Sequence, residues 1–197
     1  MAFWNKITSK FSKSKNDSDD VEDSVVNEII EVCYAYDTTS YINSIEETWS
    51  DSLTLDDKKA LDPVLSCLSL GVAIRFLRNK YGKKSDNINK KLLNLVYSSA
   101  LSVTNSPDLP AEDIANFYVE LIDNYSNILD YDAAGVIDYG MGVCEKVFEV
   151  VEDLFDQLKP SPSIALSMMT FISKFGSKIS GLIETAEEKY DYFPSDT

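Results

Sequence analysis

The stretch that decides the fold is "VLSCLSLGVAIRFL", residues 64–77, a nearly unbroken run of apolar and small side chains. It is too short to cross a bilayer, because a membrane-spanning helix needs about 20 apolar residues. A second apolar stretch, residues 164–183, carries Lys174 and Lys178 in its middle. Both stretches are therefore expected to form helices in the core of a water-soluble domain.

Residues on either side of the first stretch set its limits. Asp62-Pro63 predicts a helix start, because proline at the first helical position gives up no hydrogen bond. The helix should run to about Tyr81, where Gly82 supplies the left-handed residue that ends many helices. Ser85 should then cap a second helix, whose apolar residues recur at helical spacing: Ile88, Leu92, Leu95, Val96 and Leu101.

Helical spacing of apolar residues recurs in the rest of the chain, near residues 25–36, 41–49, 114–129, 143–158 and from 163 onward. No segment longer than five residues alternates with period two, so strands are not expected. We predict an all-α, single-domain helical bundle of about six helices with a short amphipathic N-terminal segment. The expected divisions are a basic amphipathic segment (1–15), an acidic linker (16–24), the helical domain (25–190) and a C-terminal tail (191–197).

Charge is distributed unevenly along the chain. The 18 basic and 33 acidic side chains leave a formal net charge of -15, which disfavours direct binding to nucleic acid. Positive charge gathers at residues 1–15 and at residues 75–91, where Asp86 is the single acid. We call Arg75, Arg78, Lys80, Lys83 and Lys84 the basic corner. It could bind phosphates or an acidic partner, or it could be a solvated helix end whose cations complement the helix dipole.

Several classes of chemistry are excluded by composition. The chain has no histidine, so it offers no imidazole base, nucleophile partner or metal ligand. Cys33, Cys67 and Cys144 are far apart and form no CxxC pair. No glycine-rich phosphate loop, nucleophile elbow or secretory signal is recognisable. We therefore expect a cytoplasmic protein that is not an enzyme and has no cofactor.

The N-terminal segment has the pattern of an interfacial helix. Spacings of three and four residues place its aromatic and aliphatic side chains on one face and its lysines around the other. Such a segment could bind an anionic membrane surface, or it could dock on a protein partner or on its own domain. The residues concerned are Phe3, Trp4, Lys6, Ile7, Lys10 and Phe11.

Residues 130–141, "DYDAAGVIDYGM", partly resemble the calcium-binding loop of EF-hand proteins. Asp130, Asp132 and Asp138 fall at the first, third and ninth positions of that pattern. Ala134 and Met141 depart from it, because both replace side chains that would supply oxygen ligands. The resemblance implies a weak metal site, and the alternative is an acidic turn between two helices.

A further acidic pattern lies in the helix expected at 143–158. Four carboxylates there share one helical face: Glu145, Glu149, Glu152 and Asp156. We expect an acidic helical adaptor, assembly factor or regulator that acts by binding protein, with peripheral membrane association as an addition. One alternative is a nucleic-acid mimic that inhibits a DNA- or RNA-binding protein. A second is a carboxylate-based divalent-metal-binding protein or enzyme.

Overall fold

The computed structural model describes residues 21–35, 55–103, 110–129, 136–149 and 162–190. Within these ranges the secondary structure is helical and no strand occurs, which confirms the all-α prediction for this part of the chain. A 3-10 turn, η1 (Gly82–Ser85), joins two of the helices. The α-helices are α2 (Val21–Ala35), α4 (Leu55–Tyr81), α5 (Asp86–Val103), α6 (Ala111–Ile128), α7 (Val136–Glu149) and α8 (Pro162–Tyr190).

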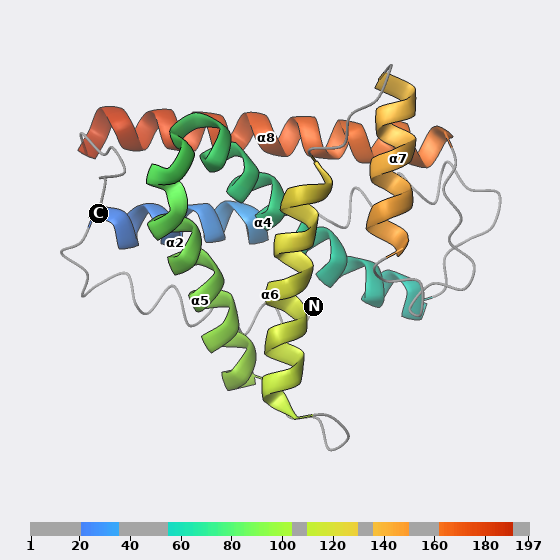
Figure 1. The fold of residues 1–197 in the computed structure, drawn as a ribbon, viewed down its shortest axis with the longest axis horizontal. Coiled ribbons are helices and arrows are strands. Elements are labelled where there is room, and N and C mark those ends of the chain that lie inside the picture. Colours follow the sequence, from blue (N-terminus) through green and yellow to red (C-terminus); the bar gives the residue numbers. More distant parts are fainter. Residues whose placement is uncertain (1–20, 36–54, 104–109, 130–135, 150–161, 191–197) are drawn as a thin grey trace.

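The two longest helices, α4 and α8, pack against each other and against most of the other helices. In Figure 1, α8 lies along the upper edge, and α5 and α6 lie side by side below it and run in opposite directions. Helix α4 packs against α2, α6 and α8, while α7 packs mainly on α8. In the described ranges, no helix combines the length and the apolar character needed to cross a bilayer.

Helix α4 forms the centre of the core. Every residue from Val64 to Ile74 is buried, including Ser66 and Ser69. A helix that is buried on all sides has no polar face, unlike the amphipathic helices around it. The Ser69 hydroxyl donates to the carbonyl of Leu65 at 3.0 Å, so this polar group is satisfied within the helix.

Gly71 allows α4 and α6 to approach each other closely. A Cβ atom at this position would lie 2.9 Å from the Cβ of Tyr125 and 3.0 Å from the backbone nitrogen of Ser126. Such distances are shorter than van der Waals contact, and the backbone of α6 cannot move away as a flexible side chain could. Any larger residue here would push the two helices apart.

We expect Gly71→Ala to destabilise the protein by about 1–3 kcal/mol, because it overpacks this contact. Gly181→Ala is the matched control, since Gly181 lies in α8 with no atom within 4 Å of an added Cβ. The control should stabilise the protein by about 0.5–1 kcal/mol through its higher helix propensity. Urea unfolding followed by circular dichroism measures both, and equal effects of the two substitutions would contradict the close contact.

The corner between α4 and α5 lies where the sequence predicts it, but the hydroxyl of Ser85 bonds to groups other than the backbone N–H of α5 that a helix cap would bind. Helix α4 ends at Tyr81, and Gly82 has a φ of 59°, in the left-handed region that glycine adopts most easily. Ser85 directly precedes α5 and is buried. Its hydroxyl donates to the carbonyl of Gly82 at 2.7 Å and accepts from Nδ2 of Asn89 at 3.1 Å.

Three predicted limits are corrected by the structure. Helix α4 does not restart at Asp62-Pro63, because Pro63 lies inside a continuous helix that begins at Leu55. Helix α2 begins at Val21, so residues 21–24 form a helical turn instead of the end of a linker. Helix α7 begins at Val136, so the second half of the EF-hand-like stretch is helical and not an interhelix turn.

Two tyrosine hydroxyls bind carbonyl groups near helix ends. Tyr125 is fully buried, and its hydroxyl donates to the carbonyl of Val147 at 3.2 Å, two residues before α7 ends. The hydroxyl of Tyr139 donates to the carbonyl of Leu129 at 2.7 Å, directly after α6. The last carbonyls of a helix lack partners within it, so these bonds tie α6 and α7 together.

We expect Tyr125→Phe to destabilise the protein by about 1–2 kcal/mol, because the carbonyl of Val147 would lose its buried donor. Tyr97→Phe is the control, since its hydroxyl makes a long, exposed contact of 3.4 Å to Glu112. That change should stay within about 0.5 kcal/mol. Thermal unfolding of both variants tests the role of the buried bond, and a neutral Tyr125→Phe would contradict it.

Candidate functional site

The basic corner uses part of its charge to hold helices together. Nη2 of Arg78 lies 3.1 Å from Oδ1 of Asp123 on α6. Nη1 of Arg78 donates to the hydroxyl of Ser126 at 2.9 Å and to Oδ1 of Asn127 at 3.3 Å. The planar guanidinium thus joins the end of α4 to three side chains of α6, a geometry that lysine could not reproduce.

Lys80 and Tyr81 join the same end of α4 to α8. Nζ of Lys80 lies 2.7 Å from Oε2 of Glu187, and the Tyr81 hydroxyl donates to Oε1 of the same carboxylate. Partial burial by itself would raise the pKa of Glu187, but the hydrogen bonds from Lys80 and Tyr81 and the charge of Lys80 together lower it below its usual value. The carboxylate therefore stays ionised and keeps α4 attached to α8.

Lys91, just beyond the basic corner on α5, makes a third connection. Its Nζ lies 2.7 Å from Oδ1 of Asp23 and 3.0 Å from Oε1 of Glu22 on the first turn of α2. Asn87 also donates to Glu22, at 2.8 Å. These bonds explain why acids follow directly after Val21: they complement the N-terminus of α2 and bind α5 at the same time.

Of the basic corner itself, Lys83 and Lys84 lie exposed on η1, and Arg75 is half-buried on α4. The structure therefore places the five predicted residues around one corner but gives Arg78 and Lys80 structural roles. These ion pairs leave less free positive charge for an outside ligand than the sequence count suggests. Phosphate binding at this corner stays a sequence prediction.

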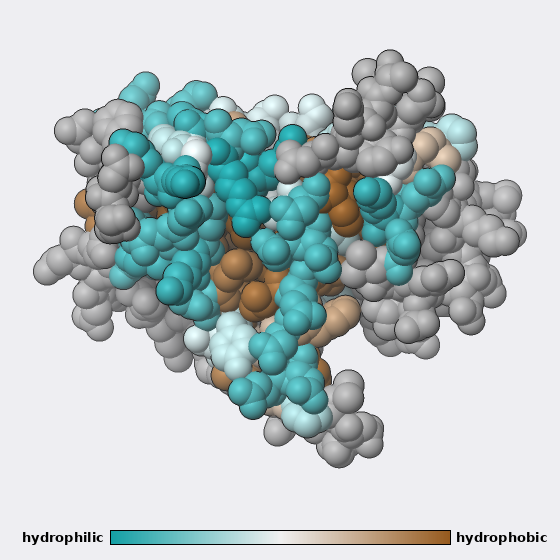
Figure 2. Space-filling model, in the orientation of Figure 1, coloured by the Kyte–Doolittle hydropathy of each residue, from teal (hydrophilic) through white to brown (hydrophobic). Residues whose placement is uncertain are grey.

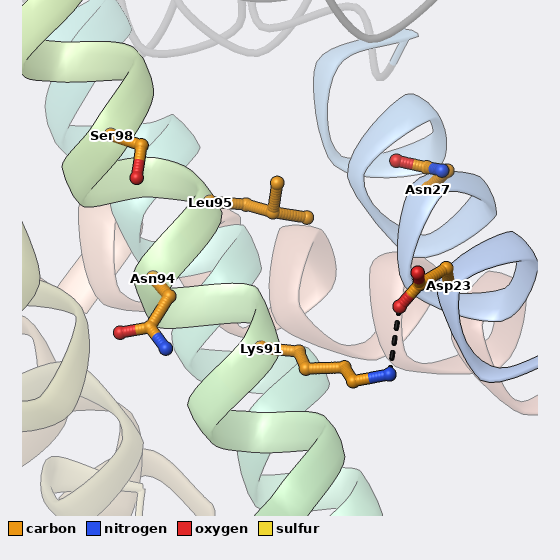
Figure 3. A pocket seen from close by; sticks show the side chains of 6 residues that line it. All are labelled: Asp23, Asn27, Lys91, Asn94, Leu95 and Ser98. Carbon is orange, nitrogen blue, oxygen red and sulfur yellow. Dashed lines mark hydrogen bonds and ion pairs between the residues drawn. The ribbon is translucent and has the colours of Figure 1, made fainter. Parts of the chain in front are cut away.

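A pocket lies beside this corner, between α2 and α5, with a volume of about 270 Å³. Figure 3 shows Asp23 and Asn27 extending from α2 toward α5, and Lys91 and Leu95 extending from α5 toward α2. The Asp23–Lys91 ion pair bridges α2 and α5 below Leu95 and Asn27 in this view. The α5 side is completed by Asn94 and Ser98, both exposed.

Sequence reasoning did not find this pocket, because its residues form no known motif. One signal was present: Asn27 interrupts the apolar series of α2, between Val26 and Ile29. An asparagine at such a position is buried, and Asn27 is 6% exposed. Buried polar side chains usually have a hydrogen-bond partner, so an asparagine within an apolar helical face is a sequence signal for a polar site next to the core.

The outer face of α6 is a second candidate surface. Its exposed residues recur at helical spacing, and the charged ones are all acidic: Glu112, Asp113 and Glu120. Phe117 is 43% exposed in their midst and packs edge-on against Tyr118 at 5.8 Å between ring centres. In Figure 2, polar residues cover α5 and α6, with apolar residues visible between these helices.

The predicted N-terminal docking residues lie outside the described residues, as do Asp130 and Asp132. Asp138 belongs to α7, and only its backbone is described. Of the acidic stripe, Glu145 and Glu149 are exposed one turn apart on α7, and Glu152 and Asp156 fall beyond the described part. Among described residues, no group of three or more acids or cysteines could hold a metal ion.

All three cysteines are buried, and none forms a disulfide. Burial raises the pKa of the Cys144 thiol to about 12, and the charge of Glu145 adds to the rise. Burial likewise raises the pKa values of Cys33 and Cys67 above the usual value. The thiols therefore stay protonated at neutral pH and serve as small apolar core residues.

Comparisons with known proteins indicate no function, so function is inferred from the geometry of the structure. No family model, curated protein or solved structure matches this chain.

The Glu187 site gives a pH-dependent expectation. Because folding lowers the pKa of Glu187, its stabilisation is fully present above the unfolded-state value of about 4.3 and is lost as pH falls through the folded value. The difference in unfolding free energy between the native chain and Glu187→Gln should stay constant from pH 7 to about pH 5.5 and shrink below about pH 4.5. Urea unfolding at four pH values measures it.

Lys80→Gln provides the control for this pH dependence. Without the ammonium group, Glu187 loses its shortest ionic contact, so the Glu187→Gln difference in this background should vary less with pH. If the Glu187→Gln difference in unfolding free energy grows as pH falls, in either background, that result would contradict a lowered pKa of Glu187.

Proposed function

We propose that this chain is a non-enzymatic, acidic helical adaptor that binds a basic protein partner through the outer face of α6. In this proposal the whole chain forms one bundle of about six helices, and the protein is located in the cytoplasm. The observation that carries it is Phe117, a large aromatic side chain left 43% exposed between acidic residues.

Charge supports a basic partner. Helix α6 contains four acids and no lysine or arginine: Glu112, Asp113, Glu120 and Asp123. Asp123 is paired with Arg78, while Glu112 and Asp113 also complement the N-terminal end of the helix dipole. Glu120 lies beyond the first turn, so the dipole does not explain its position.

Shape supports a protein contact. Protein interfaces combine a central aromatic side chain with a polar rim, and aromatic residues at such centres often carry much of the binding energy. Phe117 and its acidic neighbours have this arrangement on a single helix.

The N-terminal segment adds a membrane contact to the proposal. Its aromatic residues and lysines would hold the acidic domain at an anionic surface, with about 1 kcal/mol from each lysine near the surface. This part rests on the sequence pattern of residues 1–15. Flotation with anionic vesicles, comparing the full chain with Trp4→Ala/Phe11→Ala, tests it separately from the α6 surface.

The test of the α6 surface is affinity capture from a nuclease-treated lysate of the native host. We expect a strongly basic protein to be retained by the native chain and lost in 0.5 M salt, because screening weakens exposed charge contacts, for which the Debye length falls to about 3–5 Å. Phe117→Ser and Glu120→Lys should each reduce its recovery at least about tenfold.

Leu166→Ser is the matched control, because Leu166 is 66% exposed on α8 and its loss removes an apolar side chain elsewhere. Circular dichroism verifies that all three variants are folded. Equal recovery with Phe117→Ser and Leu166→Ser would contradict the proposed surface. A captured DNA- or RNA-binding protein would favour the nucleic-acid-mimic form of the proposal.

A further inference from the structure

Phe117 differs from the other large apolar side chains that are exposed in the described part of the chain, Leu101 and Leu166. No acid lies within one helical turn of Leu101 on α5 or of Leu166 on α8. Phe117 has Asp113 four residues before it and Glu120 three residues after it, and these spacings place all three side chains on one face of α6. This surface therefore suits a ligand that combines apolar side chains with positive charge.

Residues 1–15 of this chain have that combination. Their four lysines and the absence of any acid give the segment a side-chain charge of +4. In a helix, spacings of four and three place Lys6, Lys10 and Lys13 in a row beside the apolar residues of the segment. Lys6 and Lys13 are seven residues apart, as are Asp113 and Glu120, which corresponds to about 10 Å along a helix axis in both cases. The segment thus matches the α6 surface in charge and in spacing.

The segment can also reach this surface. It precedes α2, which begins at Val21. The carboxylate of Glu22 accepts a hydrogen bond from Asn87 on α5, and α5 packs along α6 (Figure 1). Packed helices lie about 8–10 Å apart, so the start of α2 is about two such spacings, or about 20 Å, from α6. Residues 12–20 span up to about 30 Å when extended, so residues 3–11 can lie against α6.

An intramolecular contact of this kind needs little intrinsic affinity. A segment joined by a short linker has an effective concentration in the millimolar range, so a dissociation constant of about 1 mM is enough to fill about half of the surface. We propose that residues 3–11 of this chain occupy the α6 surface around Phe117 while no partner is bound. The inference rests on the proposed function for its consequence, which is that a basic partner must displace the segment.

The test places a nitroxide at position 9, because Ser9 lies on the helical face opposite the apolar residues of the segment. Ser9→Cys in the full chain can be labelled selectively, since all three native cysteines are buried. With the segment bound about half of the time, the backbone amide signals of residues 113–120 should lose at least about half of their intensity when the nitroxide is oxidised instead of reduced. The amides around Leu166, at the start of α8, should keep their intensity.

Variants in this labelled chain test the charge contacts and the apolar contact. Phe117→Ser, Glu120→Lys and the double change Lys6→Glu/Lys10→Glu should each reduce the intensity loss at residues 113–120 at least about twofold. Glu145→Lys is the matched control, because Glu145 is exposed on α7 and its substitution changes the net charge as much as Glu120→Lys does. The control should leave the intensity loss unchanged.

A mixed sample identifies the molecule that supplies the segment. The ¹⁵N-labelled chain without a nitroxide is combined with unlabelled chain that carries one, so any loss of intensity comes from another molecule, and we expect none. Three results would overturn the proposal: no intensity loss at residues 113–120 in the labelled full chain, equal effects of Glu120→Lys and Glu145→Lys, or intensity loss in the mixed sample, which would assign the contact to a second copy.

The nitroxide measurement and the capture from a lysate can fail separately. Intensity loss at residues 113–120 without capture of a basic protein would support the intramolecular contact and contradict the adaptor proposal. Capture of a basic protein that depends on Phe117, without intensity loss at these residues, would support the adaptor proposal and contradict the intramolecular contact.

Discussion

Burial of α4 on every side between Val64 and Ile74 is the constraint on which the rest of the structure depends. A helix without a polar face must be covered completely, so other helices have to surround it. Helices α2, α6 and α8 do so, and Gly71 allows α6 to approach at backbone distance. The positions of the candidate surfaces follow, because α5 and α6 carry them on the sides turned away from α4.

Electrostatics then fix the helices relative to one another. Lysine and arginine side chains near the α4–α5 corner each reach a carboxylate on a different helix: Arg78 on α6, Lys80 on α8 and Lys91 on α2. Such pairs contribute little stability individually when exposed, but they select among packing arrangements. Helix α6 itself contains no lysine or arginine, so acidic groups are the charged groups on its exposed face, as the proposed basic partner requires.

Local signals in the sequence predicted much of this fold. The glycine at position 82 predicted the end of α4, and apolar spacing predicted α5, α6 and α8. The helix start predicted at Pro63 was wrong. Proline is tolerated inside the long helix α4 because tertiary packing outweighs the hydrogen bond that proline cannot make. The early start of α7 at Val136 was missed because acidic and glycine residues there resembled a loop.

The candidate sites were predictable only in part. Cation clustering identified the basic corner, but its partners lie up to 107 positions away in the sequence, as for Lys80 and Glu187, and no local pattern reveals them. The pocket at Asn27 depends on how α2 crosses α5, which is a tertiary property. Exposure of Phe117 likewise required the packed structure, because helical spacing of apolar residues over 114–129 does not show which of them stay exposed.

Native-state hydrogen exchange of the backbone amides of α4 tests the central role of this helix most directly. If α4 is the centre of the core, the amides of residues 64–74 should exchange only through global unfolding, with an opening free energy equal to the value from urea unfolding. If these amides exchange through local opening, at a lower free energy than the amides of α6 or α8, then α4 does not hold the fold together.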